Sequence, residues 1–117
     1  MAGMKTATIV SGGGFPAFQL WEVLRVGGTL PAGITVSRQF QNLESGCAQL
    51  TVQSDPDNGA TIFHMGMDSA VSPTDAGLQL NAGASYTWNA VDKNAVSLLR
   101  WFKSTAAGSL LVTIEEY

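Results

Sequence analysis

Cysteine and histidine are almost absent from this chain of 117 residues, which has one of each, Cys47 and His64. A single cysteine excludes an internal disulfide and a cysteine-rich metal site. A nucleophilic cysteine needs a basic partner, and His64 is the only histidine that could serve. We therefore interpret Cys47 as a small apolar residue at the start of a strand and His64 as a strand residue, and we expect a reducing compartment.

Charge is scarce as well. Charged residues make up 13% of the chain, against about 25% in an average protein, and the net charge is −3. Nucleic acids and anionic membranes are bound by concentrated positive charge, so we expect neither as a partner. A weakly charged surface suits a protein that packs against copies of itself or other proteins. The basic residues are scattered along the chain: Lys5, Arg25, Arg38, Lys93, Arg100 and Lys103.

Long apolar runs are also missing. No stretch approaches the roughly 7 to 15 residues of a signal-peptide core or the roughly 20 residues of a membrane-spanning helix. Residues 1–5 lead directly into an alternating segment at residues 6–10. We therefore expect no membrane segment and no secretion by the usual route.

The sequence does contain many short segments in which apolar and polar residues alternate, separated by Gly, Pro, Asn and Asp. In residues 47–53, Ala48, Leu50 and Val52 alternate with mostly polar neighbours, which gives one buried face and one wet face. Repeated segments of this kind are typical of antiparallel strands. The sequence predicts an all-β fold, a small antiparallel β-sandwich or jelly-roll-like barrel with an extended N-terminal arm.

Residues 47–117 are predicted to form a compact module of about six strands. Asn58-Gly59 predicts a type I′ hairpin turn that pairs the strand at 47–53 with the next, at 60–67. Further strands are expected at 78–81, 85–90, 95–103 and 110–114. Large aromatic side chains in the strand at 85–90, Tyr86 and Trp88, are expected to organise the core.

Residues 1–46 differ from the rest, because glycine-rich breaks separate two short apolar segments, 18–26 and 34–37. The segment at 18–26 fits either a strand or a short helix, and its valines and flanking glycines favour a strand. Apolar segments without a core of their own commonly need a partner to cover them. We therefore predict that this arm contacts another subunit, and the candidate partner-binding residues are Phe15, Phe18, Leu20 and Trp21.

No motif in the sequence indicates catalysis. Asp55, Asp57 and Asn58 could begin a calcium loop, but Pro56 interrupts them and no bidentate glutamate follows at the required position, so a plain turn is favoured. The glycine-rich stretch at 11–16 lacks the lysine of a phosphate-binding loop and is interpreted as a hinge. Nothing in the spacing of the carboxylates requires an acid–base pair. We assign no catalytic, cofactor-binding or metal-binding residue, and we do not expect an enzyme.

The aromatic residues leave a second class of function open. Trp21, Trp88, Trp101, Tyr86 and Tyr117 could stack on sugar rings if they were exposed along one sheet face. Alternating strand positions among Leu and Val more often place such residues in the core. The carbohydrate-binding interpretation therefore ranks below core packing.

The second part of the chain resembles small bacteriophage virion proteins with a β-sandwich fold, such as capsid decoration (cement) proteins. The resemblance rests on loose turn signatures and covers residues 47–117. The matching segments are 65–72 (MGMDSAVS), 77–83 (GLQLNAG), 86–88 (YTW), 91–92 (VD), 99–102 (LRWF), 106–108 (AAG) and 111–115 (LVTIE).

This resemblance implies a mechanical role, in which many copies bridge neighbouring major capsid subunits and stabilise the shell. It also implies a homo-oligomer, with a trimer preferred because capsids offer three-fold positions, and a location in the virion after assembly in the host cytoplasm. A tail or head–tail component is an alternative within the virion. A carbohydrate-binding or adhesin module is the alternative from another class.

Overall fold

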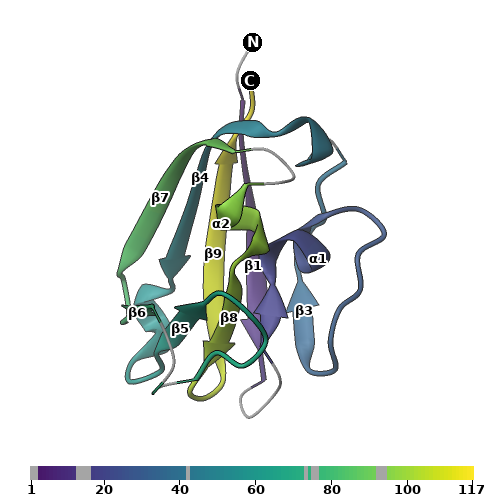
Figure 1. Ribbon diagram of the computed structural model, residues 1–117. Coiled ribbons are helices and arrows are strands. Elements are labelled where there is room, and N and C mark those ends of the chain that lie inside the picture. The colour runs from purple at the N-terminus through teal and green to yellow at the C-terminus, as the bar shows by residue number, and fades with distance from the viewer. Residues whose placement is uncertain (1–2, 13–16, 42, 73, 75–76, 92–94) are drawn as a thin grey trace.

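Two antiparallel β-sheets packed face to face make up the protein in the computed structural model, which describes residues 3–12, 17–41, 43–72, 74, 77–91 and 95–117 (Figure 1). The large sheet has the strand order β3-β1-β9-β4-β7 and the small sheet the order β2-β8-β5-β6. The predicted all-β, antiparallel sandwich is confirmed. The strands are β1 (Met4–Ser11), β2 (Phe18–Gln19), β3 (Ile34–Val36), β4 (Cys47–Ser54), β5 (Phe63–Gly66), β6 (Leu78–Leu80), β7 (Ser85–Val91), β8 (Trp101–Ser104) and β9 (Gly108–Glu115).

The inward face of the large sheet follows the alternation in the sequence. Leu110, Val112 and Ile114 on β9 are buried, as predicted, and so are Leu50 and Val52 on β4. Directly paired residues of antiparallel strands lie on the same face, and Leu50 pairs with Ile114 and Val52 with Val112. These pairs form a continuous apolar layer against the small sheet.

The small sheet contributes most of the aromatic core. Phe18 and Phe102 are paired across β2 and β8, and their rings stack with centroids 5.9 Å apart. Phe63 on β5 is fully buried in the same core. Strand β5 is buried on both faces, because the chain after it folds back over Gly66, where an added Cβ would lie 2.7 Å from Val71.

The first third of the chain belongs to this core and is not an extended arm. Strand β1 lies between β3 and β9, and it pairs with β9 over its whole length, from Met4 opposite Glu115 to Ser11 opposite Gly108. Alternate residues of β1, including Ala7 and Ile9, face the core. The boundary that the sequence suggested after residue 46 therefore does not separate two structural units.

The segment at residues 18–26 contains a short helix where a strand was favoured. The named strand in this segment, β2, has two residues, and α1 (Leu20–Leu24) follows at once. Leu20, Val23 and Leu24 are fully buried, and their spacing places them on one face of a helix rather than one face of a strand. A second short helix, α2 (Val96–Leu99), occupies part of the apolar run at 95–103, before β8.

The predicted hairpin at Asn58-Gly59 is wrong. Strand β4 pairs with β7 and β9, whereas β5 lies in the other sheet. The intervening residues form a 3₁₀ turn, η2 (Pro56–Asn58), capped by the side chain of Asp55, which accepts the Asp57 N–H at 2.9 Å. The Asn58 amide donates to the Ser109 carbonyl at 2.9 Å, which ties the turn to β9 and directs the chain from one sheet to the other.

A chain truncated to residues 47–117 is expected not to fold on its own. It would lack β1, β2, α1 and β3, so β9 would lose a neighbour and the inward faces of both sheets would be exposed to water. Circular dichroism during heating should show a cooperative transition for the full chain and none for the truncated chain. Removal of Tyr117 alone, which is exposed and outside the strands, should leave the transition in place. A cooperative transition in the truncated chain would contradict this expectation.

Candidate functional site

The residues predicted to contact a partner are largely used inside the protein. Phe18 and Leu20 are buried, at 1% and 0% exposure, because β2 and α1 cover one end of the core. Trp21 is half-buried, and the Arg25 guanidinium lies 5.7 Å from its ring centroid. Phe15 lies outside the described residues. The structure therefore corrects the prediction for Phe18 and Leu20, which are not available as a contact surface in this fold.

Cys47 and His64 do not form a catalytic pair. Cys47 is fully buried on β4 of the large sheet, and burial raises the pKa of its thiol, an effect that a backbone hydrogen bond at Gln49 only partly offsets. Phe63 and Met65 face the core from β5, so His64 between them faces the opposite side of the small sheet. The core layer separates the two residues. The interpretation of Cys47 as an apolar core residue agrees with its burial.

The acidic turn after β4 is a structural cap. The Asp55 carboxylate accepts the Asp57 N–H, and the Asn58 side chain bridges Ser54 Oγ and the Ser109 backbone. Its oxygen also accepts the Ser109 N–H at 2.9 Å. Among the described residues, no group of three or more His, Cys, Asp and Glu side chains could hold a metal ion.

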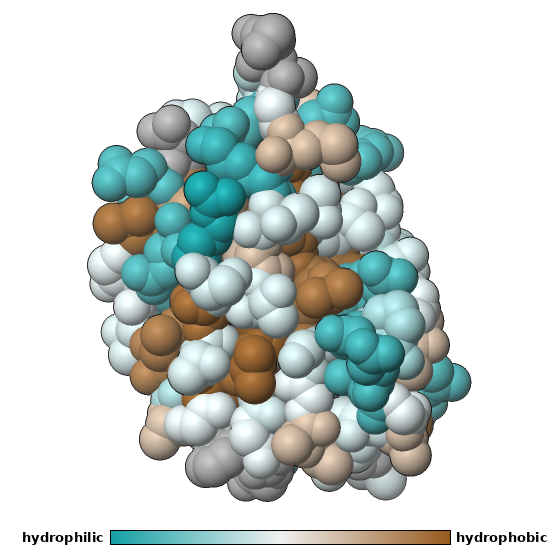
Figure 2. Space-filling model, turned by 180° about the vertical axis from the view of Figure 1, so that it is seen from behind, coloured by the Kyte–Doolittle hydropathy of each residue, from teal (hydrophilic) through white to brown (hydrophobic). Residues whose placement is uncertain are grey.

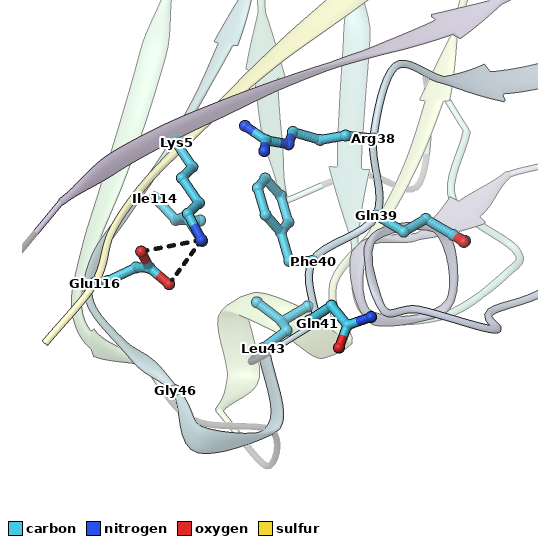
Figure 3. Close-up of a pocket in the computed structure, with 9 residues that line it drawn as sticks. All are labelled: Lys5, Arg38, Gln39, Phe40, Gln41, Leu43, Gly46, Ile114 and Glu116. Carbon is cyan, nitrogen blue, oxygen red and sulfur yellow. Dashed lines mark hydrogen bonds and ion pairs between the residues drawn. The ribbon is translucent and has the colours of Figure 1, made fainter.

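A small hollow lies where the start of β1 and the end of β9 meet the segment before β4 (Figure 3). Its volume is about 100 Å³, room for a few water molecules but well below the roughly 300 Å³ of the smallest typical ligand sites. The Lys5 ammonium faces the Glu116 carboxylate at 3.2 Å, and the Arg38 guanidinium lies 5.6 Å from the Phe40 ring centroid. The Lys5–Glu116 pair is neutral in sum, so the lining carries one net positive charge, that of Arg38.

The outer face of the large sheet carries side chains in a regular pattern. A row of threonines crosses four adjacent strands, since Thr6 pairs with Thr113, Thr113 with Thr51, and Thr51 with Thr87. The hydroxyls of Thr51 and Thr87 are 2.9 Å apart. Neighbouring strands lie about 4.8 Å apart, so the row is an evenly spaced line of hydroxyl and methyl groups.

This face carries little charge, and no helix formed by the described residues lies over it (Figure 1). Figure 2 views it from outside, and pale or teal side chains surround a smaller number of brown apolar ones. Next to the threonine row, Gln49 on β4 donates to Asn89 on β7 at 3.2 Å. Glu115 is the only charged residue at the outward positions of β1, β9, β4 and β7 in the described ranges.

Strand β7 forms one edge of the large sheet and carries an aromatic pair. Tyr86 and Trp88 pair with Val52 and Leu50, and their rings are 4.8 Å apart with a tilt of 49°. Tyr86 is 43% exposed and Trp88 is half-buried, so the pair lies at the side of the sandwich rather than at the centre of the core. The expectation that both residues organise the core is therefore wrong for Tyr86. Hydrophobic alternation places a residue on a face, but it does not reveal that its strand lies at an edge.

The tryptophans do not share one surface. Trp88 lies on the edge of the large sheet, Trp101 pairs with Gly66 and Gln19 in the small sheet, and Trp21 lies on α1. A sugar platform built from all three is therefore not formed. Tyr86 and Trp88 are the aromatic pair that remains accessible.

Comparison with known proteins adds no family to this description, because the chain matches no protein-family model, no curated protein and no solved structure. The resemblance to phage virion proteins stays a prediction from sequence. In the described part of the chain, no helix is long and apolar enough to cross a membrane.

His64 is expected to make stability depend on pH. It is 2% exposed, its Nδ1 has no hydrogen-bond partner within the described part of the chain, and burial lowers its pKa. The unfolded chain therefore binds a proton more readily than the folded chain. The free energy of unfolding is therefore unaffected by His64 above the unfolded pKa of about 6.5, where the side chain is neutral in both states. Below that pH it falls, by at most about 1.4 kcal/mol per pH unit.

Urea unfolding at pH 7.5, 6.5 and 5.5 measures this effect, in a range where carboxylates contribute little. The His64→Gln variant cannot titrate there, so the drop in its free energy of unfolding should be smaller than that of the unmodified chain. Equal pH dependence in the two proteins would show that His64 is not the group responsible.

Proposed function

We propose that this chain is a non-enzymatic structural protein of a bacteriophage virion, a capsid decoration protein that binds and bridges major capsid subunits. The observation that carries the proposal is the outer face of the large sheet. It is built from four paired strands and presents hydroxyl, amide and methyl groups with a single charge. Such a face suits a broad contact with another protein better than capture of a small ligand.

The chemistry of this face also suits a lasting contact. Its polar side chains are partly paired with one another, as in the Thr51–Thr87 and Gln49–Asn89 contacts. Burying a polar group that keeps a hydrogen bond costs much less than burying one that loses it. The apolar residues Val10 and Leu111 lie on the same face and add area that gains about 25 cal/mol per Å² when buried.

The proposed location can be tested on virions. Particles from the phage that encodes the chain would be purified on a density gradient and probed with an antibody against the chain. We expect it to travel with the particles in a constant ratio to the major capsid protein. A chain found only in the soluble fraction of the lysate would overturn the proposal, and a position in isolated tails would favour the tail component instead.

The binding face can be tested with a matched pair of variants. Thr113→Lys places a charge in the middle of the threonine row, whereas Ser69→Lys places the same charge at an exposed position in the loop after β5. Thr113→Lys should weaken rebinding to stripped capsids at least about tenfold, because an unpaired charge would be buried, while Ser69→Lys should not. Equal binding of the two variants would exclude this face as the contact.

A carbohydrate-binding module is the second candidate, and the Tyr86–Trp88 pair, in which Tyr86 is exposed and Trp88 half-buried, is the observation that favours it. This role predicts glycan binding that Tyr86→Ala reduces at least about tenfold without loss of folding. Tyr117→Ala removes another exposed tyrosine, far from the pair along the chain, and is the control. If the virion proposal is right, a glycan array should give no signal that depends on Tyr86.

A further inference from the structure

Strand β7 is an edge of the large sheet, and no strand among the described residues pairs with its outer side. It has seven residues, whereas the strands at the other three sheet edges, β2, β3 and β6, have two, three and three. Short edge strands, charges, prolines and coverage by other segments are the usual means of preventing edge-to-edge pairing. Residues 85–91 contain no charge and no proline, and five of the seven are exposed. The fold leaves one long strand ready to accept another strand.

The hydrogen-bonding groups that β7 offers can be assigned from the ladder. The Ser54 N–H on β4 donates to the Ala84 carbonyl, whereas the next N–H, of Asp55, donates to Ser109 on β9. The direction of the backbone N–H and C=O groups alternates from residue to residue along a strand. Val52 and Leu50 on β4 therefore point these groups toward β7, as Ser54 does, and bond to Tyr86 and Trp88. The intervening residues direct their N–H and C=O groups away from the sheet. These residues are Ser85, Thr87 and Asn89.

This edge is complementary to itself. If two copies of β7 run antiparallel with Thr87 opposite Thr87, then Ser85 lies opposite the second copy's Asn89. All outward-directed backbone groups of these residues then face one another, and each pair exchanges both of its hydrogen bonds. On one face hydroxyl and amide side chains meet. On the other, Tyr86 of each copy lies opposite Trp88 of its neighbour, so that four aromatic rings adjoin.

We infer that a second copy of the chain binds at β7, which joins two large sheets into one continuous sheet around a two-fold axis. The two copies each carry a net charge of −3, but the strand itself is uncharged, so like charges are not brought together at the contact. Pairing between the two copies ends near Ala90, where φ is 53° and the strand is irregular. At this point Ala48 on β4 has no partner in the β4–β7 register. The threonine row then continues from one copy into the other.

This inference does not rest on the virion role, and it names a dimer where the resemblance implied a trimer. A strand-edge contact is small, so the dissociation constant is expected to be on the order of 10 to 100 µM. Light scattering over a dilution series of the full chain should show a change from the mass of two chains to the mass of one. A monomer at all concentrations up to about 1 mM, or a trimer, would overturn the inference.

Amide hydrogen exchange identifies the edge without any substitution. The amides of Ser85, Thr87 and Asn89 should be protected at high protein concentration and exposed on dilution. The amides of Tyr86 and Trp88 bond within the sheet, so they should be protected at both concentrations. A mass that depends on concentration without this alternating protection would place the interface elsewhere and overturn the inference.

A charge exchange at position 87 tests the two-fold register. Thr87→Lys places two ammonium groups opposite each other and should weaken the dimer at least about tenfold. Thr6→Lys adds the same charge to the same threonine row, at an exposed position on β1, and should leave the dimer unchanged. Thr87→Glu should also give monomers, and a mixture of Thr87→Lys and Thr87→Glu chains should form a mixed dimer.

Restoration of the dimer in the mixture also shows that both variants are folded. If the mixture stays monomeric while each variant keeps the circular dichroism of the unmodified chain, the register is wrong. If Thr6→Lys weakens the dimer as much as Thr87→Lys, the contact lies on the sheet face and not at its edge. A chain that forms the dimer but does not bind capsids would overturn the proposed virion role and leave the dimer inference standing.

Discussion

The pairing of the first strand with the last strand determines how the rest of the protein is arranged. Strand β9 lies between β1 and β4, so the C-terminal segment is at the centre of the large sheet and the N-terminal segment is beside it (Figure 1). Met4 opposite Glu115 and Ser11 opposite Gly108 join residues that are almost a chain length apart. Closing such a long loop costs entropy that is recovered only when the inward residues of β1 and β9 are buried together. The sandwich is therefore expected to fold as a single cooperative unit, even though the sequence changes character near residue 46.

The same topology leaves β7 exposed. With β9 at the centre, β4 has β9 on one side and β7 on the other, and no strand in the described part of the chain pairs with the outer side of β7. The other sheet edges are short. Strand β2 is followed directly by α1, and β3 and β6 have three residues each. The position of β7 at the edge of the large sheet has two results: Tyr86 is exposed at the side of the sandwich, and the outward backbone groups of β7 have no partner strand among the described residues.

The sequence predicts features that depend on neighbours within a few residues, and it misses those that depend on distant ones. The alternation of Leu110, Val112 and Ile114 identified a buried strand face, and the structure confirms it. Asn58-Gly59 looked like a hairpin because the dipeptide favours the turn, but hydrogen bonds from Asn58 to Ser109, far along the chain, decide the path instead. The spacing of Leu20, Val23 and Leu24 contained the helical signal, and valine content outweighed it. Whether Tyr86 is core or edge could not be read from β7 alone, since it depends on where β9 lies.

The outer face of the large sheet gives a physical reason for the low charge of the chain. Under the proposed role this face is buried against another protein, and such a face cannot keep many charges, because each charge would lose its hydration unless it met a partner. Threonine, glutamine and asparagine avoid that cost in two ways: they are neutral, and they hydrogen-bond to one another across strands, as Gln49 does with Asn89. Such a face remains wettable in the separate chain and is inexpensive to bury in an assembly. The same composition makes edge pairing at β7 possible, because no charge along that strand opposes an approaching strand.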